Sequence, residues 1–339
     1  MSDDLDLDRL AEALREQGVT VTGGLACRLI TGGRSNLTYE LVDEAGAHHV
    51  LRMPPRGSGE GRAHDVTREQ SIFSALVGSA VPVPRIEAHR ADDEVLGSPF
   101  FVAEFVDGVV LQSRSDGDGL ERGLRAVASD SIVDNLAAIH AIDLDRTGLR
   151  RLGPGEGYLE RELRRWTLRA ARGGYAGAEG LIETGEALSD SMPAEYEVTL
   201  VHGDFKFPNA MIDPASGRIA AILDWELATV GDPLVDLGNL LANWPNPGEK
   251  GLFDSPTNSD GFRDRSEVVA RYASLTGRSV ERVDWYHSFG LWRLAALLMS
   301  VIDRYRQGSL RDDFDLEAGS ALVADLADLA LETLLGERG

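Results

Sequence analysis

The sequence is poor in cysteine, in positive charge and in long apolar runs. Cys27 is the single cysteine among 339 residues, so no disulfide can form within the chain. Aspartate and glutamate number 56 against 34 lysines and arginines, which gives a formal net charge of −22. Phosphate backbones require a concentrated basic surface, so this balance argues against a nucleic-acid partner. It is compatible with a cationic small molecule, and equally with a charge that only favours solubility.

No segment predicts a membrane span or a secretion signal. The longest apolar stretch, residues 289–302, contains Arg293 and is too short to cross a bilayer. The first residues are rich in aspartate, where a secretion signal would carry positive charge and then an apolar run. Together with the single cysteine, these features predict a cytoplasmic protein with no membrane partner. The oligomeric state is left open between monomer and homodimer.

The predicted elements change in character along the chain. A helix over residues 5–16 is followed by three strands, which the turn residues between them join as an antiparallel meander. The early elements are strands at residues 25–31, 37–42, 48–53 and 99–106 and a helix at 64–77. Later helices are expected at residues 119–141, 157–172, 177–190, 262–276, 282–307 and 315–336. The sequence therefore predicts an α+β fold with a β-rich part, residues 1–106, and a mostly helical part, residues 107–339.

One segment of the helical part brings polar residues to the ends of two predicted strands. Residues 198–201 read as a strand that leads into the run from His202 to Asn209, and a second strand ends at Asp224. Side chains at strand ends are held rigidly and remain open to ligands. In phosphoryl transfer, a carboxylate accepts the proton of the attacking hydroxyl, and oxygen ligands hold Mg²⁺. Asp204 is the candidate base, and Asn209 and Asp224 are the candidate Mg²⁺ ligands.

The same segment resembles a known family. The motif His202-Gly203-Asp204 with Asn209, followed by Ile222-Leu223-Asp224-Trp225-Glu226, is similar to the paired signature of the aminoglycoside phosphotransferases, a branch of the protein-kinase-like fold. Residues 227–237 and 135–143 resemble the subgroup related to domains fused to acyl-CoA dehydrogenases. The resemblance extends over residues 25–305.

This resemblance implies a bilobal protein. It implies a small antiparallel sheet with one main helix as the N-lobe and a larger, mostly helical C-lobe. The implied activity is that of a small-molecule kinase, which transfers the γ-phosphate of ATP to a hydroxyl group of its acceptor with Mg²⁺ as cofactor.

The resemblance also implies a nucleotide site in the N-terminal part. The turn that contains Gly33, Ser35 and Asn36 stands where the family has its glycine-rich phosphate loop, although an ordinary hairpin turn would use the same residues. Arg52 occupies the position of the phosphate-binding lysine of kinases, and Glu69 would be its partner. Read without the family, Arg52 and Glu69 could be solvated charges.

Two further positions follow from the resemblance. Glu104 and Val106 would form the hinge between the lobes and bind the adenine through their backbone atoms. Lys206, two residues after Asp204, would neutralise the transferring phosphate, or else be a surface charge. Glu226 would join the metal ligands or face solvent.

Several other polar and aromatic residues are expected to have structural roles. His202 has no second nitrogen or sulfur ligand in a matching pair, so it is interpreted as a brace of the loop. Asp232 is a candidate helix cap, and Asp236 is a candidate brace. A stripe at helical spacing is expected to be core, with part of it lining the acceptor site: Trp285, Phe289, Trp292, Ala296 and Met299.

The sequence leaves open whether the phosphate acceptor is an anionic or a cationic molecule. The subgroup resemblance favours a hydroxyacyl-CoA or another metabolite, whereas the net negative charge suits a polycationic aminoglycoside. An anionic acceptor could use the arginines of one predicted helix, or those residues could form a solvated face: Arg161, Arg164, Arg165, Arg169 and Arg172. A nucleotide-binding pseudokinase without turnover is the alternative of another class.

Overall fold

The computed structural model describes residues 5–32, 36–55, 65–173, 177–194, 196–249, 251–308 and 314–336. Its N-terminal part is a five-stranded antiparallel sheet in the order β1-β2-β3-β5-β4. The strands are β1 (Leu25–Gly32), β2 (Leu37–Asp43), β3 (His48–Met53), β4 (Ile86–Arg90) and β5 (Phe100–Glu104). The expected meander β1-β2-β3 is confirmed, and β5 is inserted between β3 and the edge strand β4.

The two faces of the sheet bury different residues of β5. Side chains alternate across a strand, so Phe100 and Val102 share one face and Phe101 and Ala103 the other. The first pair packs in a cluster with residues of α1 (Leu7–Glu16), and the second pair packs with residues of α2 (Val66–Leu76). Each face of this strand therefore rests against one helix.

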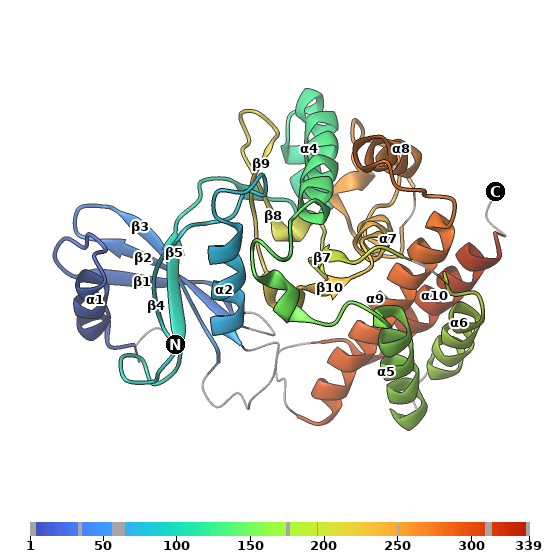
Figure 1. Ribbon diagram of the computed structural model, residues 1–339, viewed down its shortest axis with the longest axis horizontal. Helices are drawn as coiled ribbons and strands as arrows, with labels where there is room; N and C mark the ends of the chain where they lie inside the picture. The colour runs from blue at the N-terminus through green and yellow to red at the C-terminus, as the bar shows by residue number, and fades with distance from the viewer. Residues whose placement is uncertain are drawn as a thin grey trace.

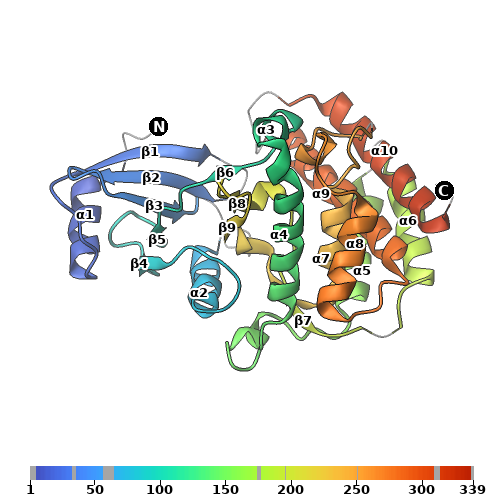
Figure 2. The ribbon, with the colours of Figure 1, turned by 90° about the horizontal axis from the view of Figure 1, so that it is seen from above.

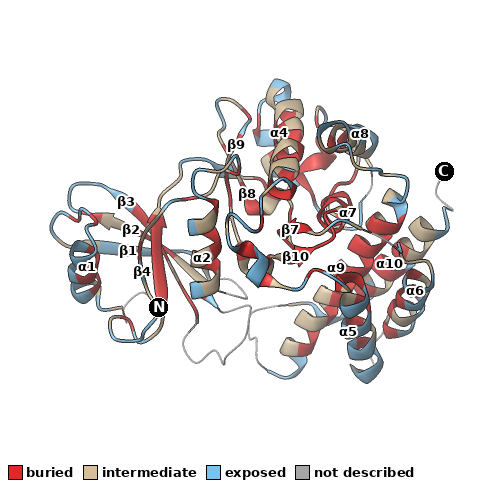
Figure 3. Cartoon of the chain, in the orientation of Figure 1, coloured by how far each residue is buried: buried red, intermediate tan, exposed pale blue. Residues whose placement is uncertain are grey.

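The rest of the chain is mostly helical and lies beside the sheet (Figure 1). Its helices are α3 (Arg114–Gly119), α4 (Arg122–His140), α5 (Tyr158–Gly173), α6 (Ala178–Asp190), α7 (Leu234–Ala242), α8 (Arg265–Thr276), α9 (Val283–Arg306) and α10 (Leu316–Leu335). Among the packed pairs are α7 with α9 and α9 with α10. Buried residues run along β5 and α7, whereas the outward sides of α5 and α6 are exposed (Figure 3). None of the helices within the described ranges is long and apolar enough to cross a membrane.

Two small sheets belong to the helical part, and the first lies between the large sheet and α4 (Figure 2). This first sheet pairs β6 (Val109–Val110) with β8 (Ala210–Ile212) and β8 with β9 (Ile219–Ile222). The other pairs β7 (Thr199–Val201) with β10 (Thr229–Gly231). The sequence did not predict β4, β6, β8, β10 or α3. All of these elements are only two to six residues long, and such lengths leave little periodicity to detect.

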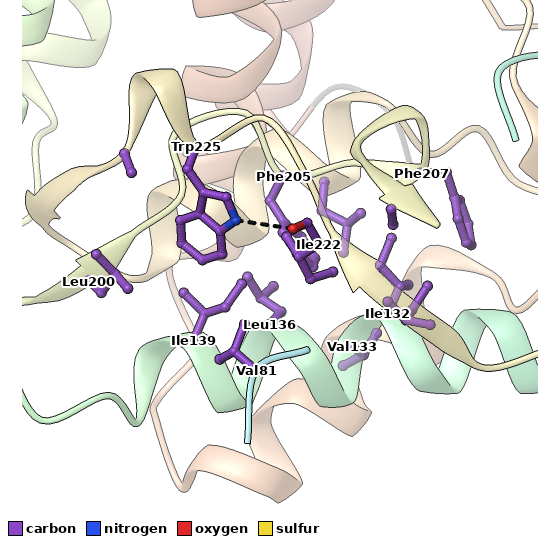
Figure 4. Close-up of a cluster of buried hydrophobic side chains, with 14 of the residues drawn as sticks. Val81, Ile132, Val133, Leu136, Ile139, Leu200, Phe205, Phe207, Ile222 and Trp225 are labelled. Carbon is purple, nitrogen blue, oxygen red and sulfur yellow. Dashed lines mark hydrogen bonds between the residues drawn. The ribbon is translucent and has the colours of Figure 1, made fainter. Parts of the chain in front are cut away.

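The core of the helical part fixes these short strands. Ile132, Leu136 and Ile139 of α4 pack against Phe205, Ile222 and Trp225 (Figure 4). The indole Nε1–H of Trp225 donates to the carbonyl oxygen of Ile222 at 3.2 Å, so even the polar atom of this buried ring is satisfied. The polar residues between β7 and β10 therefore stand on a rigid apolar base.

Candidate active site

Residues 202–209 connect β7 to β8 and are called the HGD loop below. His202 is fully buried, its ring Nε2 lies 3.0 Å from the carbonyl oxygen of Leu223, and its backbone N–H donates to Asp236 at 2.6 Å. Gly203 has φ of +84°, and a Cβ there would lie 2.6 Å from the carbonyl oxygen of Leu227. Only glycine fits both requirements. The contacts of His202 agree with its interpretation as a brace.

Asp236 holds the start of the HGD loop. It lies on α7, is fully buried, and accepts backbone hydrogen bonds from His202 at 2.6 Å and from Gly203 at 2.8 Å. His140 of α4 lies 3.4 Å from the same carboxylate. Burial acts to raise the pKa of Asp236, but these partners outweigh it and lower the pKa. The structure thus gives Asp236 the bracing role that the sequence suggested.

Asp204, Lys206 and Asn209 converge at the open end of the HGD loop. The ammonium group of Lys206 lies 2.9 Å from Asp204 Oδ1, and Asn209 Nδ2 donates to Asp204 Oδ2 at 2.9 Å. Asn209 Nδ2 also donates to the carbonyl oxygen of Asp204 at 2.8 Å. The Asp204 carboxylate is therefore held at both oxygens and keeps 20% of its side chain exposed. Within the described residues no hydrogen bond reaches Asn209 Oδ1.

The pairing of β8 with β9 brings Asp224 to within one residue of the backbone partner of Asn209. Ala210 pairs with Ile222, and the N–H of Leu223 donates to the carbonyl oxygen of Asn209 at 2.9 Å. Asp224 follows with φ of +62°, and no other non-glycine residue of the described ranges has positive φ. Such backbone strain is concentrated at functional sites. Here it occurs where the strand ends, at the residue the sequence assigns to Mg²⁺.

Arg52 reaches this point from the large sheet. It lies on β3, with Nε 2.7 Å from Glu69 of α2, Nη2 2.5 Å from Asp224 Oδ1, and Nη2 3.6 Å from Glu226. Burial opposes the charge of Arg52, but Glu69, Asp224 and Glu226 together raise its pKa. Burial raises the pKa of Glu69 to about 7, against the lowering effect of Arg52. The expected pair of Arg52 and Glu69 is thus present, and Glu226 faces Arg52 with little exposure.

The expected nucleotide residues are described in part. Gly33 and Ser35 lie outside the described residues. Asn36 is 3% exposed, and within the described ranges neither its Oδ1 nor its Nδ2 has a hydrogen-bond partner. Glu104 ends β5 opposite His49 of β3, and Val106 follows it on the way to β6. Both residues therefore lie where the chain passes from the large sheet to the helical part.

These oxygen ligands fit a magnesium ion. Asp224 offers a carboxylate, and Asn209 offers the amide oxygen that its own N–H bonds leave open. Mg²⁺ takes one or two protein ligands and completes its shell with water and substrate phosphates. No group of three histidine, cysteine, aspartate or glutamate side chains within the described ranges would hold a metal ion by itself. The donor set therefore suits a cation that takes its remaining ligands from outside the chain.

The remaining residues that the sequence singled out have other surroundings. Asp232 was a candidate helix cap, but the N-cap of α7 is Pro233, the next residue. The Asp232 carboxylate accepts the O–H of Tyr286 at 2.5 Å and the N–H of Leu234 at 2.9 Å. The five α5 arginines are exposed. The aromatic stripe of α9 is buried, which confirms it as core. A cavity of about 610 Å³ lies between the end of α7, α9 and α10, and none of the expected site residues lines it.

The architecture is that of a protein-kinase-like fold, with an antiparallel five-stranded sheet before a mostly helical part. Residues 26–268 match the sequence model of the family described as phosphotransferase enzyme family. The chain belongs to this family.

Several known proteins and solved structures are similar to this chain. It is 31% identical over 309 residues to mouse acyl-CoA dehydrogenase family member 11, a match that covers 88% of this chain and 39% of that protein. The chain spans less than half the length of such curated relatives. A crystal structure of a candidate aminoglycoside phosphotransferase from Ralstonia eutropha is 27% identical, covers 98% of both chains and has a TM-score of 0.82. A complex of aminoglycoside phosphotransferase APH(4)-Ia with ADP and hygromycin B shares the fold, at 18% identity over 97% of this chain and 98% of that chain, with a TM-score of 0.64.

Proposed function

We propose that this chain transfers the γ-phosphoryl group of ATP to a hydroxyl group of a small molecule. One observation carries the proposal. The Asp204 carboxylate is fixed between Lys206 and Asn209, and Leu223, the residue before Asp224, is bonded to the backbone of Asn209. In this proposal Asp204, after β7, is the base, and Asn209 and, after β9, Asp224 supply two hard oxygen ligands, which together make the set that phosphoryl transfer requires.

In this proposal the nucleotide lies between two lobes, residues 1–106 and 107–339. Gly33, Ser35 and Asn36 belong to the phosphate loop, and the backbones of Glu104 and Val106 bind the adenine. The amide of buried Asn36 has no hydrogen-bond partner among the described residues, which supports a ligand near that loop, because buried polar atoms are ordinarily hydrogen-bonded.

The chemical step needs one proton acceptor. Asp204 accepts the proton of the acceptor's hydroxyl group. The oxygen of that hydroxyl group bonds to the γ-phosphorus, and the bond between this phosphorus and the β–γ bridging oxygen breaks, which releases ADP. Lys206 lies 2.9 Å from Asp204 and can balance the negative charge of the transferring group.

Asn209 and Asp224 would hold Mg²⁺, which when bound would neutralise the charge on the β- and γ-phosphate oxygens. Arg52 bonds Asp224 and is held by Glu69 in this structure. We propose that Arg52 also contacts a phosphate of ATP, since its fork of N–H groups can serve a carboxylate and a phosphate at once.

The relatives favour an acceptor from metabolism over an antibiotic. The 31% identity to a protein named as an acyl-CoA dehydrogenase family member supports a hydroxyacyl-CoA or a similar metabolite as acceptor. The aminoglycoside alternative rests on the net charge of −22 and on the fold shared with an enzyme bound to hygromycin B.

The test is ADP formation with a panel of hydroxyl acceptors, including hydroxyacyl-CoAs and aminoglycosides. Wild type is expected to form ADP in an acceptor-dependent reaction. Asp204→Ala is expected to lower turnover by about 10²–10⁴-fold, the usual contribution of a general base, while Asp107→Ala, an exposed residue, should leave it unchanged. Undiminished turnover by Asp204→Ala would remove the base assignment. Mg²⁺-dependent ATP binding without turnover on any acceptor would instead support a pseudokinase.

A further inference from the structure

Arg293 is a buried cation in the middle of α9, and only 5% of it is exposed. Its Nε and Nη1 atoms are buried, and no hydrogen-bond partner for them occurs among the described residues. No ion pair with Arg293 occurs in the part of the chain that the structure describes. Arginine is almost never buried unless it is paired, because the desolvation of its charge must be offset. Because no described residue pairs with it, this guanidinium is a candidate site for an anionic ligand.

The packing of α7 against α9 directs Arg293 toward the HGD loop. A Cβ on Gly290 of α9 would overlap the backbone of Gly238 of α7, so the two helices cross in backbone contact. Arg293 is one turn beyond Gly290 on the same side of α9. On α7, Asn239 donates to the carbonyl oxygen of Phe205 at 3.1 Å, which ties this crossing to the HGD loop.

The groups around Arg293 are already committed to other partners. Burial opposes its charge, but Tyr158, Glu162, Asp204 and Asp236 act on it and its pKa is raised. Glu162 accepts from Arg165 at 2.8 Å and from the indole N–H of Trp166 at 3.3 Å. Asp236 is occupied by the HGD loop, and Asp204 is occupied by Lys206 and Asn209, as described above. These carboxylates attract Arg293 from a distance and leave its Nε and Nη1 donors open.

We propose that Arg293 binds an oxyanion of the phosphate acceptor, a carboxylate or a phosphate, close to the hydroxyl group that Asp204 activates. This inference rests on the proposed kinase function and narrows its acceptor to anionic alcohols. An acceptor of this kind would be oriented by opposite charges. Its oxyanion would pair with Arg293, and its hydroxyl group would donate to Asp204. A polycationic acceptor would instead place positive charge against an unpaired guanidinium.

The test uses three small alcohols that differ in charge at one end: glycerate, glycerol 3-phosphate and glycerol. Calorimetry would measure their binding to wild type and to Arg293→Met, with an ATP analogue and Mg²⁺ titrated in parallel. Wild type is expected to bind at least one of the two anions more tightly than glycerol. Arg293→Met should weaken that binding by about tenfold or more, which corresponds to about 1.4 kcal/mol. Affinity for the ATP analogue should be unchanged. The two anions distinguish a carboxylate from a phosphate as the bound group.

Controls separate recognition from a structural role. Arg122→Met removes an exposed arginine of α4 and should bind both anions as wild type does. Arg293→Lys keeps the charge and should restore part of the binding. If Arg293 only positions Asp204, turnover on glycerol would fall as much as turnover on the anions, and the proposal would be wrong. Equal binding of anions by wild type and Arg293→Met, or no preference of wild type for anions over glycerol, would also overturn it. Failure to bind the ATP analogue would instead count against the kinase function.

Discussion

Replacing Asp236 by alanine should disturb both stability and turnover, because one buried carboxylate holds two backbone donors of the HGD loop. The N–H groups of His202 and Gly203, at 2.6 and 2.8 Å, would stay buried without an acceptor. An unsatisfied buried donor costs about 1–3 kcal/mol, so the two together amount to about 2–6 kcal/mol. Domains are stable by only about 5–15 kcal/mol, so this is a large fraction of the total. Asp236→Asn keeps the side-chain volume and one acceptor oxygen, so its free energy of unfolding should fall by less than that of Asp236→Ala.

Urea unfolding of the variants would give the free energies, and ADP formation would report the position of Asp204. Asp264→Ala is the matched control. Asp264 caps α8 by accepting the N–H of Glu267 at 2.9 Å, so its loss costs about 1 kcal/mol without touching the HGD loop. Both Asp236 variants should slow turnover more than this control. The reasoning would be refuted if Asp236→Ala unfolded within about 1 kcal/mol of wild type, or if its turnover matched that of Asp264→Ala.

Three further changes test other contacts. Gly290→Ala should lower the free energy of unfolding by about 1–3 kcal/mol through overpacking against the backbone of α7, measured by urea unfolding. Burial raises the pKa of Asp232 to about 6, so the folded protein holds a proton that the unfolded chain releases. The free energy of unfolding should therefore fall by roughly 3 kcal/mol as pH rises from about 4 to about 6. The Asp232→Asn variant can still accept the hydrogen bond of Tyr286, and its free energy of unfolding should not show this fall. Arg52→Met should lower the free energy of unfolding by about 3–5 kcal/mol, because it leaves Glu69 buried without its partner. Glu69→Gln in the same chain should recover part of that loss.

The HGD loop could be predicted because its residues are close in sequence and its chemistry needs particular residue types. Asp204 and Asn209 stand five residues apart, and Asp224 ends the next predicted strand. The pair of Arg52 and Glu69 was expected from the resemblance, and the structure brings the two side chains to 2.7 Å. The approach of Asp224 to Arg52 was not foreseen, since it depends on how the large sheet meets the helical part.

Arg293 shows what sequence patterns leave out. In the sequence it appears only as a charge that interrupts an apolar helical stretch. That interruption was a signal, because a charge among core residues needs a partner. Whether Arg293 has a partner depends on contacts from other parts of the chain, and no periodicity reports those. The lone charge becomes informative only when Gly290 and Gly238 are seen to bring α9 against α7.

The charge of the acceptor is better judged from Arg293 than from the net charge of −22. Exposed charges, including the arginines of α5, are screened by salt over about 8 Å at physiological ionic strength. A buried guanidinium acts through a medium of low polarity and is screened much less. A preference for anionic acceptors that comes from Arg293 should therefore persist as salt is raised, whereas one that comes from the exposed α5 arginines should fade. Measuring the glycerate to glycerol preference at low and high salt decides which arginines select the acceptor.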